Sequence, residues 1–283
     1  MGFQRVVSSL LGIATVAAAS AESGAFMLAP DIHGDQVLFT REGDVWLGNL
    51  VTGTAQRLTR HEGLETKARF SPDGSQIAFQ GQYDGGGNQV YVMPILGGIP
   101  RRVTNRLNAA TLEDWTADGQ KLLCRGPGPE FVSEPFLVPA AGGPEERIPL
   151  QKMGPGQVGP NQQLAFCRFG DISGGAWFRY EGGSRNDIWV GNLPALSFKK
   201  VFESKTQAGF PVWVGDRVFF THENQATWTI NSVPGTGGAP KRHAGPFNEY
   251  ISDLQTDGKR LIYIRANKLE VLDPATGKAT PID

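Results

Sequence analysis

The sequence predicts an all-β fold, a six-bladed β-propeller made of four-stranded antiparallel blades. Three observations predict it: a composition rich in turn residues, a strand-and-turn pattern that repeats six times, and three consecutive apolar residues at the same place in each repeat. The 283 residues include 37 Gly and 19 Pro, which indicates frequent turns in place of long helices. An apolar content of 40% is enough for a sizeable core.

Each repeat opens with a turn such as Pro72-Asp73-Gly74, followed by an apolar triplet. The triplets are Val37–Phe39, Ile77–Phe79, Leu122–Cys124, Leu164–Phe166, Val218–Phe220 and Leu261–Tyr263. They recur at intervals of about 40 to 54 residues, and a propeller blade of four strands takes about 44.

A second strand follows each triplet and carries a central aromatic residue in five repeats. These residues are Trp46, Tyr91, Phe136, Trp189 and Trp228, and Glu270 stands at the place in the sixth repeat. A further turn, such as Thr52-Gly53, and a short strand complete the unit. Strands joined by turns of this kind form an antiparallel meander.

The triplets favour a propeller over a flat sandwich. A strand with water on one face alternates apolar and polar residues, whereas three consecutive apolar residues require burial on both faces. In a propeller the second strand of each blade lies between the two neighbouring blades, so both of its faces are dry.

The predicted propeller covers residues 27–283. Its blades are expected at about 27–60, 65–104, 111–150, 157–202, 209–243 and 249–283. Cys124 and Cys167 fall on different blades, so we interpret both as small core residues and expect no disulfide between them.

Residues 1–21 read as a secretory signal peptide. Arg5 precedes an apolar run from Val6 to Ala19, and small residues follow at Ala19-Ser20-Ala21. We therefore expect export to the periplasm or the outside of the cell. An N-terminal helix packed on the domain is the alternative. No later apolar run approaches the length of a membrane span, so no membrane-spanning segment is expected after removal of the signal peptide.

Composition excludes several classes of function. The 27 basic and 28 acidic residues leave a net charge of −1, so no basic surplus points to nucleic acid. The two cysteines lie in no motif with zinc spacing, and the four histidines form no His-x-x-x-His pattern. The sequence predicts neither a metal site nor a cofactor.

With the repeats aligned, the chain resembles the six-bladed propeller that opens tricorn-type serine proteases. The likeness begins at Leu28–Phe39 and Gly43–Trp46, continues through Ala68–Gly74 and Tyr180–Trp189, and ends with Thr256–Gly258 and Asp273-Pro274. The Ser-Pro-Asp-Gly element at 71–74 is shared with TolB-type propellers and is less specific.

The resemblance implies a module of a multidomain peptidase in which propellers gate or dock peptides for proteolysis. The partners it implies are peptides or proteins, including the remaining domains of such a protease. The sequence departs from the family in that no position matches the part that carries the catalytic residues, so we expect no turnover from this chain alone. A free-standing TolB-like propeller that mediates protein–protein interactions in the cell envelope is an alternative, and a hydrolase centred on the channel is a third.

The side chains most often used in catalysis read as structural. No G-x-S-x-G elbow is present. His33 is interpreted as a turn residue, and His61 and His243 as solvated edge residues. Most aspartates stand beside Gly in hairpins, where an Asp side chain bonds its own backbone.

The long segment from Arg168 to Arg185 departs most from the repeat. It holds Trp177, Phe178, Arg179, Tyr180 and Arg185, which are residue types found at binding hot spots. These five residues are the predicted contact surface. A hairpin that packs on its own blade or the neighbouring one is the alternative.

Overall fold

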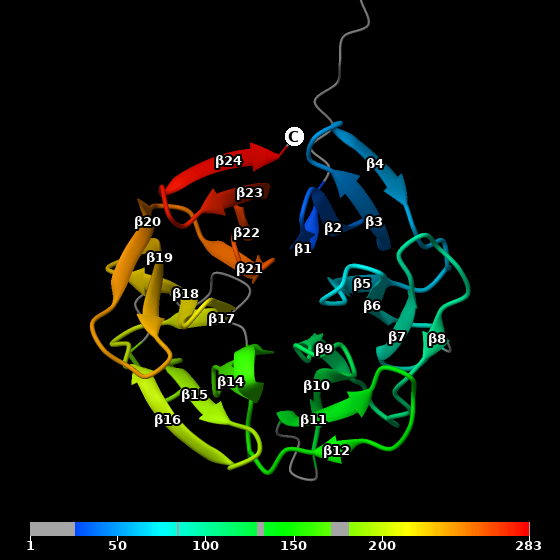
Figure 1. The fold of residues 1–283 in the computed structure, drawn as a ribbon, viewed down its shortest axis with the longest axis horizontal. Helices are drawn as coiled ribbons and strands as arrows, with labels where there is room; N and C mark the ends of the chain where they lie inside the picture. The colour runs from blue at the N-terminus through cyan, green and yellow to red at the C-terminus, as the bar shows by residue number, and fades with distance from the viewer. Residues whose placement is uncertain (1–25, 84, 129–132, 171–180, 283) are drawn as a thin grey trace, which may run out of the picture.

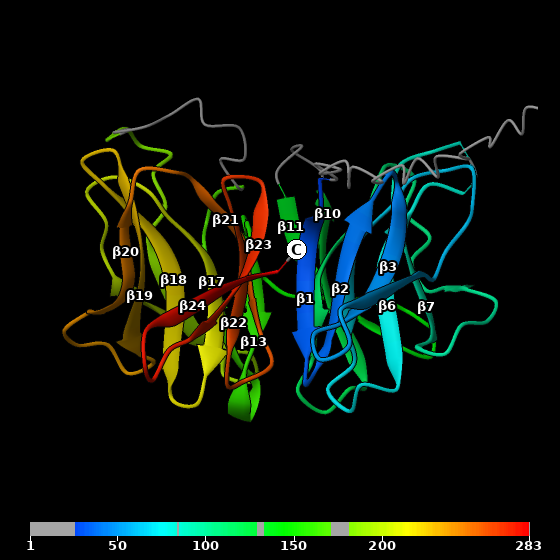
Figure 2. The same ribbon diagram turned by 90° about the horizontal axis from the view of Figure 1, so that it is seen from above.

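A computed structural model describes residues 26–83, 85–128, 133–170 and 181–282, and it has the six-bladed propeller fold that the sequence predicts. Six sheets of four antiparallel strands surround a central axis (Figure 1). The ring is seen edge-on in Figure 2, with the strands running between its two faces. Among the described residues, no helix is long and apolar enough to cross a membrane.

Each sheet comes from one continuous segment, with its four strands in chain order. Blades one to three contain β1 (Leu28–His33), β2 (Gln36–Arg41), β3 (Asp44–Asn49), β4 (Thr54–Arg57), β5 (Glu65–Phe70), β6 (Gln76–Gly81), β7 (Gln89–Pro94), β8 (Arg101–Arg102), β9 (Thr111–Trp115), β10 (Lys121–Pro127), β11 (Ser133–Pro139) and β12 (Glu146–Arg147). Blades four to six contain β13 (Gly156–Val158), the 3-10 turn η1 (Pro160–Gln162), β14 (Gln163–Phe166), β15 (Ile188–Asn192), β16 (Ser197–Phe202), β17 (Ala208–Val214), β18 (Arg217–Asn224), β19 (Thr227–Pro234), β20 (Lys241–Phe247), β21 (Ile251–Thr256), β22 (Leu261–Arg265), β23 (Lys268–Asp273) and β24 (Lys278–Ile282).

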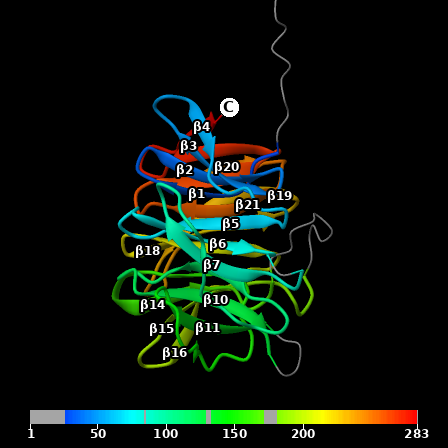
Figure 3. The same cartoon turned by 90° about the vertical axis from the view of Figure 1, so that its right-hand side faces the viewer.

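The first strand of every blade lines the axis, and the fourth lies at the rim (Figure 1). The side view in Figure 3 shows the sheets of neighbouring blades stacked one on another. The axial strands touch their neighbours all the way round, and β1 meets β21 where the last blade returns to the first.

The apolar triplets account for this stacking. In every blade the middle residue of the triplet packs in one core cluster with the following blade, and the two flanking residues pack in another with the preceding blade. Leu38, for example, packs with blade two, whereas Val37 and Phe39 pack with blade six. The predicted burial is confirmed, because Leu38, Ala78 and Ile262 are each 0% exposed.

Glu270, at the position held by an aromatic residue in the other blades, is also buried. The Tyr263 hydroxyl donates to Glu270 Oε2 at 2.6 Å, and Arg265 Nε donates to the same oxygen at 3.1 Å. A buried carboxylate is tolerated here because it has these donors.

Within residues 26–282, as far as they are described, the ring closes without a strand shared between the first and last blades. Ile32, Val37 and Phe39 of blade one pack against Ile262 and Leu269 of blade six. The Arg260 guanidinium of blade six also donates to the Gly34 carbonyl of blade one. Closure therefore depends on side-chain packing.

We expect Leu38→Ala to lower the free energy of unfolding by about 2 to 5 kcal/mol, because it leaves a cavity between two blades. Leu107→Ala is the matched control, since Leu107 is fully exposed. Urea denaturation measures both values. Equal stability of the two variants would show that the triplets are not the contacts that hold the ring together.

Candidate functional site

The axial strands share an irregularity that shapes the centre of the ring. In five of the six blades, the pairing register between the axial strand and the second strand shifts at about the same distance from the hairpin. The irregularities lie between Leu28 and Asp31, Thr66 and Arg69, Leu112 and Asp114, Gly209 and Val212, and Ser252 and Gln255. Such β-bulges bend a strand and re-aim its side chains, and they are common beside functional sites.

Four of the bulges place a residue other than glycine in the left-handed region. These residues are Ala29, Lys67, Phe210 and Asp253, with φ between 49° and 52°. This conformation is unfavourable for residues with a Cβ, so the surrounding sheet must hold it in place. Lys67, Phe210 and Asp253 all line the same axial cavity, and so does Glu113, the extra residue of the bulge in β9.

That cavity lies at the starts of the axial strands and has a volume of about 240 Å³. We call it the strand-start cavity. Two basic side chains of this cavity contact the same carboxylate. Glu113 Oε1 lies 3.0 Å from Lys67 Nζ and 2.6 Å from Arg125 Nε. Burial alone would raise the pKa of Glu113, but the two cations hold it below its usual value. Burial lowers the pKa of Lys67, and Glu113 opposes that change.

A second axial cavity of about 310 Å³ lies at the hairpin end of the same strands. We call it the hairpin-side cavity. Asp31 and Asp114 line it together with the rings of Trp115 and Trp213. Asp31 Oδ2 accepts a hydrogen bond from Phe70 N at 2.7 Å, and Asp114 Oδ1 accepts one from Trp115 N at 2.7 Å.

Both carboxyl groups of the hairpin-side cavity are hard to ionise. Burial raises the pKa of Asp31 to about 7, although Arg69 opposes it, and the charge of Asp114 raises it further. Burial also raises the pKa of Asp114 to about 6, against the hydrogen bond from Trp115 N and the charge of Arg69. Near neutral pH these groups can therefore hold or release a proton.

A belt of mostly polar residues contributes to the walls of both cavities. Its members are the axial residues that pair with the middle residue of each triplet: Asp31, Arg69, Asp114, Gln157, Val212 and Gln255. Every member lines one of the cavities, and Gln157 lines both. We call this set the axial belt.

Arg69 ties three blades together within the axial belt. Its guanidinium donates to Ala29 O and Pro30 O of β1, to Ala68 O of β5 and to Glu113 O of β9, at 2.9 to 3.4 Å. Only 1% of the residue is exposed. The guanidinium thus satisfies carbonyls at the bulges.

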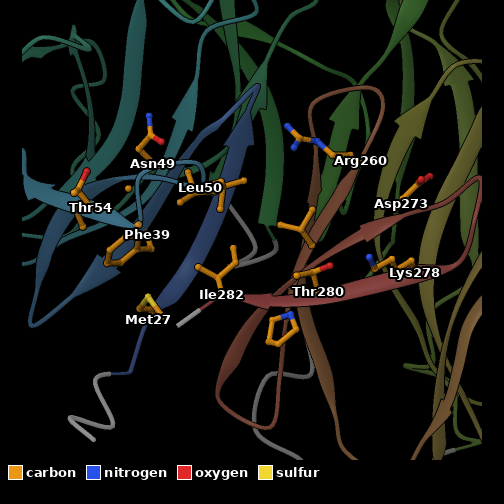
Figure 4. A pocket seen from close by; sticks show the side chains of 16 residues that line it. Met27, Phe39, Asn49, Leu50, Thr54, Arg260, Asp273, Lys278, Thr280 and Ile282 are labelled. Carbon is orange, nitrogen blue, oxygen red and sulfur yellow. The ribbon is translucent and has the colours of Figure 1, made fainter. Parts of the chain in front are cut away.

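A third cavity, of about 480 Å³, lies off the axis between blades one and six. In this seam groove, Met27, Phe39, Leu50 and Ile282 surround a mainly apolar hollow, and Asp273 and Lys278 lie toward β23 and β24 (Figure 4). The axial cavities are smaller but gather more charged and hydrogen-bonding groups. Convergent polar groups are what orient a ligand, so the axial cavities are the better candidate site.

Most of the predicted contact surface lies outside the described residues, namely Trp177, Phe178, Arg179 and Tyr180. Arg185 is described. Its Nε donates to Ser204 O at 3.0 Å, and its Nη2 lies 4.0 Å from Glu203 Oε1. Arg185 thus contacts the segment that follows β16 in its own blade. The assignment of this surface to binding stays a prediction.

His243 lies on the outer strand β20, as expected of an edge residue, but it is half-buried where the sequence predicted a solvated side chain. Its Nε2 lies 2.8 Å from Ser232 Oγ and its Nδ1 lies 2.9 Å from Pro274 O, so the ring connects blades five and six. Burial lowers the pKa of His243. His61 is exposed and its ring lies on Tyr83, with 4.1 Å between the ring centroids.

Sequence reasoning missed the charged residues of the channel. Lys67, Arg69, Glu113 and Asp253 were not selected, because they come from three different repeats and form no catalytic or metal-binding motif along the chain. The signal that could have found them is a polar residue in an axial strand just before each turn. Among the described residues, no group of three His, Cys, Asp or Glu side chains is placed to hold a metal ion.

Comparison with known proteins identifies a family with this architecture. Residues 24–278 match the family model described as the tricorn protease N-terminal β-propeller domain. The chain is 31% identical over 257 residues to "Tricorn protease homolog 1" of Streptomyces coelicolor, covering 89% of this chain and 24% of the relative.

Solved structures agree with the match. The crystal structure of the tricorn protease superposes with a TM-score of 0.79 at 24% identity, over 92% of this chain and 26% of that one. A putative TolB from Agrobacterium tumefaciens superposes with a TM-score of 0.64 at 19% identity, over 77% of this chain and 80% of that one, which shows the fold alone. The chain spans about a quarter of the length of the tricorn proteins that it matches.

We expect ionisation of Asp31 and Asp114 to lower the stability of the folded protein as the pH rises from 5 to 8. The folded-state pKa values of Asp31 and Asp114 lie above the usual 3.8, so folding favours their protonated forms and that gain disappears as they ionise. Each group contributes a slope of at most about 1.4 kcal/mol per pH unit. Asp31→Asn should flatten the pH dependence of the melting temperature.

The control is Glu42→Gln, because the Glu42 side chain is 75% exposed. It should leave the curve of the unmodified protein unchanged. If Asp31→Asn gives a curve parallel to that of the unmodified protein, Asp31 is already ionised throughout this range.

Proposed function

This chain belongs to the tricorn protease N-terminal β-propeller family, and we propose that it is a non-catalytic module that docks peptides for proteolysis by catalytic domains outside residues 1–283. The observation that carries the proposal is the pair of axial cavities that the axial belt lines. The proposal assigns no bond cleavage to this chain.

The two cavities suit short stretches of peptide. Their volumes of about 240 and 310 Å³ are at or below the lower end of ordinary ligand pockets, so each would take a few side chains. The strand-start cavity offers Lys67, Arg125 and Glu113 to polar groups, and Phe210 and Pro211 to apolar ones. The hairpin-side cavity offers carboxyl groups beside two tryptophan rings.

The geometry favours docking over passage along the axis. Arg69 lines the strand-start cavity, is buried, and is bound to carbonyls of three axial strands. Passage of a peptide would have to expose or displace this guanidinium, at the cost of several hydrogen bonds to a charged group. A peptide held in one cavity needs no such change.

We expect short fluorescein-labelled peptides to bind the purified chain, as measured by fluorescence anisotropy, and to remain intact by mass spectrometry. Thr111→Trp fills the strand-start cavity and Ala117→Trp obstructs the hairpin-side cavity, because each residue lines that cavity. At least one of these variants should weaken binding by about tenfold or more, the equivalent of about 1.4 kcal/mol.

Leu107→Trp is the control, because it adds the same side chain at a fully exposed position. Binding that survives both obstructing variants would place the peptide elsewhere. Cleavage of the peptide by the chain alone would contradict the non-catalytic role.

We propose further that the protein is exported, on the strength of residues 1–21, which lie outside the described residues. Expression with these residues in a Gram-negative host should yield a mature protein that begins at Glu22, as measured by intact mass. An uncleaved chain in the cytosol would contradict export.

A further inference from the structure

Two buried carboxyl groups meet where the chain passes from blade one to blade two. Asp44 is the first residue of β3 and is 5% exposed, and Glu65 is the first residue of β5 and is 1% exposed. Their side chains lie close enough to be hydrogen-bond partners of each other. Two ionised carboxylates cannot remain in such contact away from water without a positive charge or a proton between them.

One oxygen of each carboxyl already has a partner. Arg57 Nη2 lies 2.7 Å from Asp44 Oδ2, and the Tyr83 hydroxyl donates to Glu65 Oε1 at 2.6 Å. The Thr59 hydroxyl is a further hydrogen-bond partner of Glu65. The remaining oxygens, Asp44 Oδ1 and Glu65 Oε2, are buried and have no donor among the described residues.

We propose that Asp44 and Glu65 share one proton between these two remaining oxygens, and that this proton fastens β3 of blade one to β5 of blade two. The shared proton supplies the hydrogen-bond donor that these two oxygens lack. It also removes the repulsion between the two carboxylates. The junction is then a latch that holds while the proton is present and loosens when a base removes it.

The surroundings of the latch support this assignment. The other titratable or charged groups are Arg57 from β4, Tyr83 after β6, Tyr91 from β7 and His61 before β5. The Arg57 guanidinium lies beside Asp44, so the proton is better placed on Glu65. Burial raises the pKa of Glu65, and Asp44 raises it further against the hydrogen bonds from Thr59 and Tyr83.

A proton fits this place better than a metal ion does. A divalent cation needs about six oxygen ligands, and the pair offers one unpartnered oxygen from each of two carboxyls. The described residues supply no third acidic or histidine side chain to complete such a site. This inference is independent of peptide docking, because Asp44 and Glu65 line neither axial cavity.

The test compares the full chain with Glu65→Gln between pH 5 and pH 9. The glutamine amide keeps an acceptor for Tyr83 and offers Asp44 a hydrogen that no base removes, so the variant imitates the protonated pair. The two proteins should melt at similar temperatures at pH 5. At pH 9 the variant should melt at least about 3 °C higher.

Glu62→Gln is the control, since Glu62 is exposed in the same connection between β4 and β5, and it should follow the unmodified protein. A constant difference between Glu65→Gln and the unmodified protein across the pH range would overturn the proposal. So would a rise in the melting temperature of the unmodified protein, absent in Glu65→Gln, on addition of Ca²⁺ or Mg²⁺, because the pair would then bind a metal ion.

A second measurement uses the unmodified protein, so it tests the proposal even if Glu65→Gln fails to fold. The Cδ carbon of Glu65 in ¹³C-labelled unmodified protein should keep the chemical shift of a protonated carboxyl well above the ordinary range of glutamate ionisation. Titration of that carbon at about pH 4.5, as for an exposed glutamate, would overturn the shared proton.

Discussion

Burial of both faces of the second strand in each blade is the constraint on which the rest of this structure depends. One residue of each triplet packs forward and its two neighbours pack backward, so no blade can bury its own core alone. Only a closed arrangement gives every blade two neighbours. The same contacts fix the distance of the axial strands from the axis, and with it the size of the central channel.

The channel obtains its chemistry from departures from regular strand geometry. A regular strand would turn alternate residues into the sheet packing, whereas the bulges free Lys67, Glu113 and Asp253 to face the axis. The cost is backbone strain and unpaired carbonyls. Arg69 compensates part of that cost by donating to carbonyls of three blades, so one residue both stabilises the ring and lines its centre.

The fold was predictable from the sequence because its cause is local and repeated. Three consecutive apolar residues, such as Ile77–Phe79, indicate a strand that is buried on both faces, and turns such as Asp73-Gly74 mark the hairpins. The channel was not predictable in the same way, since Lys67 and Asp253 belong to different blades and acquire a common surrounding only through closure. The Asp44–Glu65 contact likewise crosses a blade boundary, and Asp44 beside a glycine resembles an ordinary turn residue. The prediction of a contact surface at Trp177–Tyr180 concerns residues that the structure does not describe.

In the described part of the chain the ring closes through side chains, and no strand is exchanged between the first and last blades. The number of blades could therefore change without breaking a sheet. Because each sheet is formed by one continuous segment of the chain, duplication or deletion of the segment for one blade would leave no incomplete sheet. A ring with another number of blades would still need matching apolar faces where its first and last blades meet.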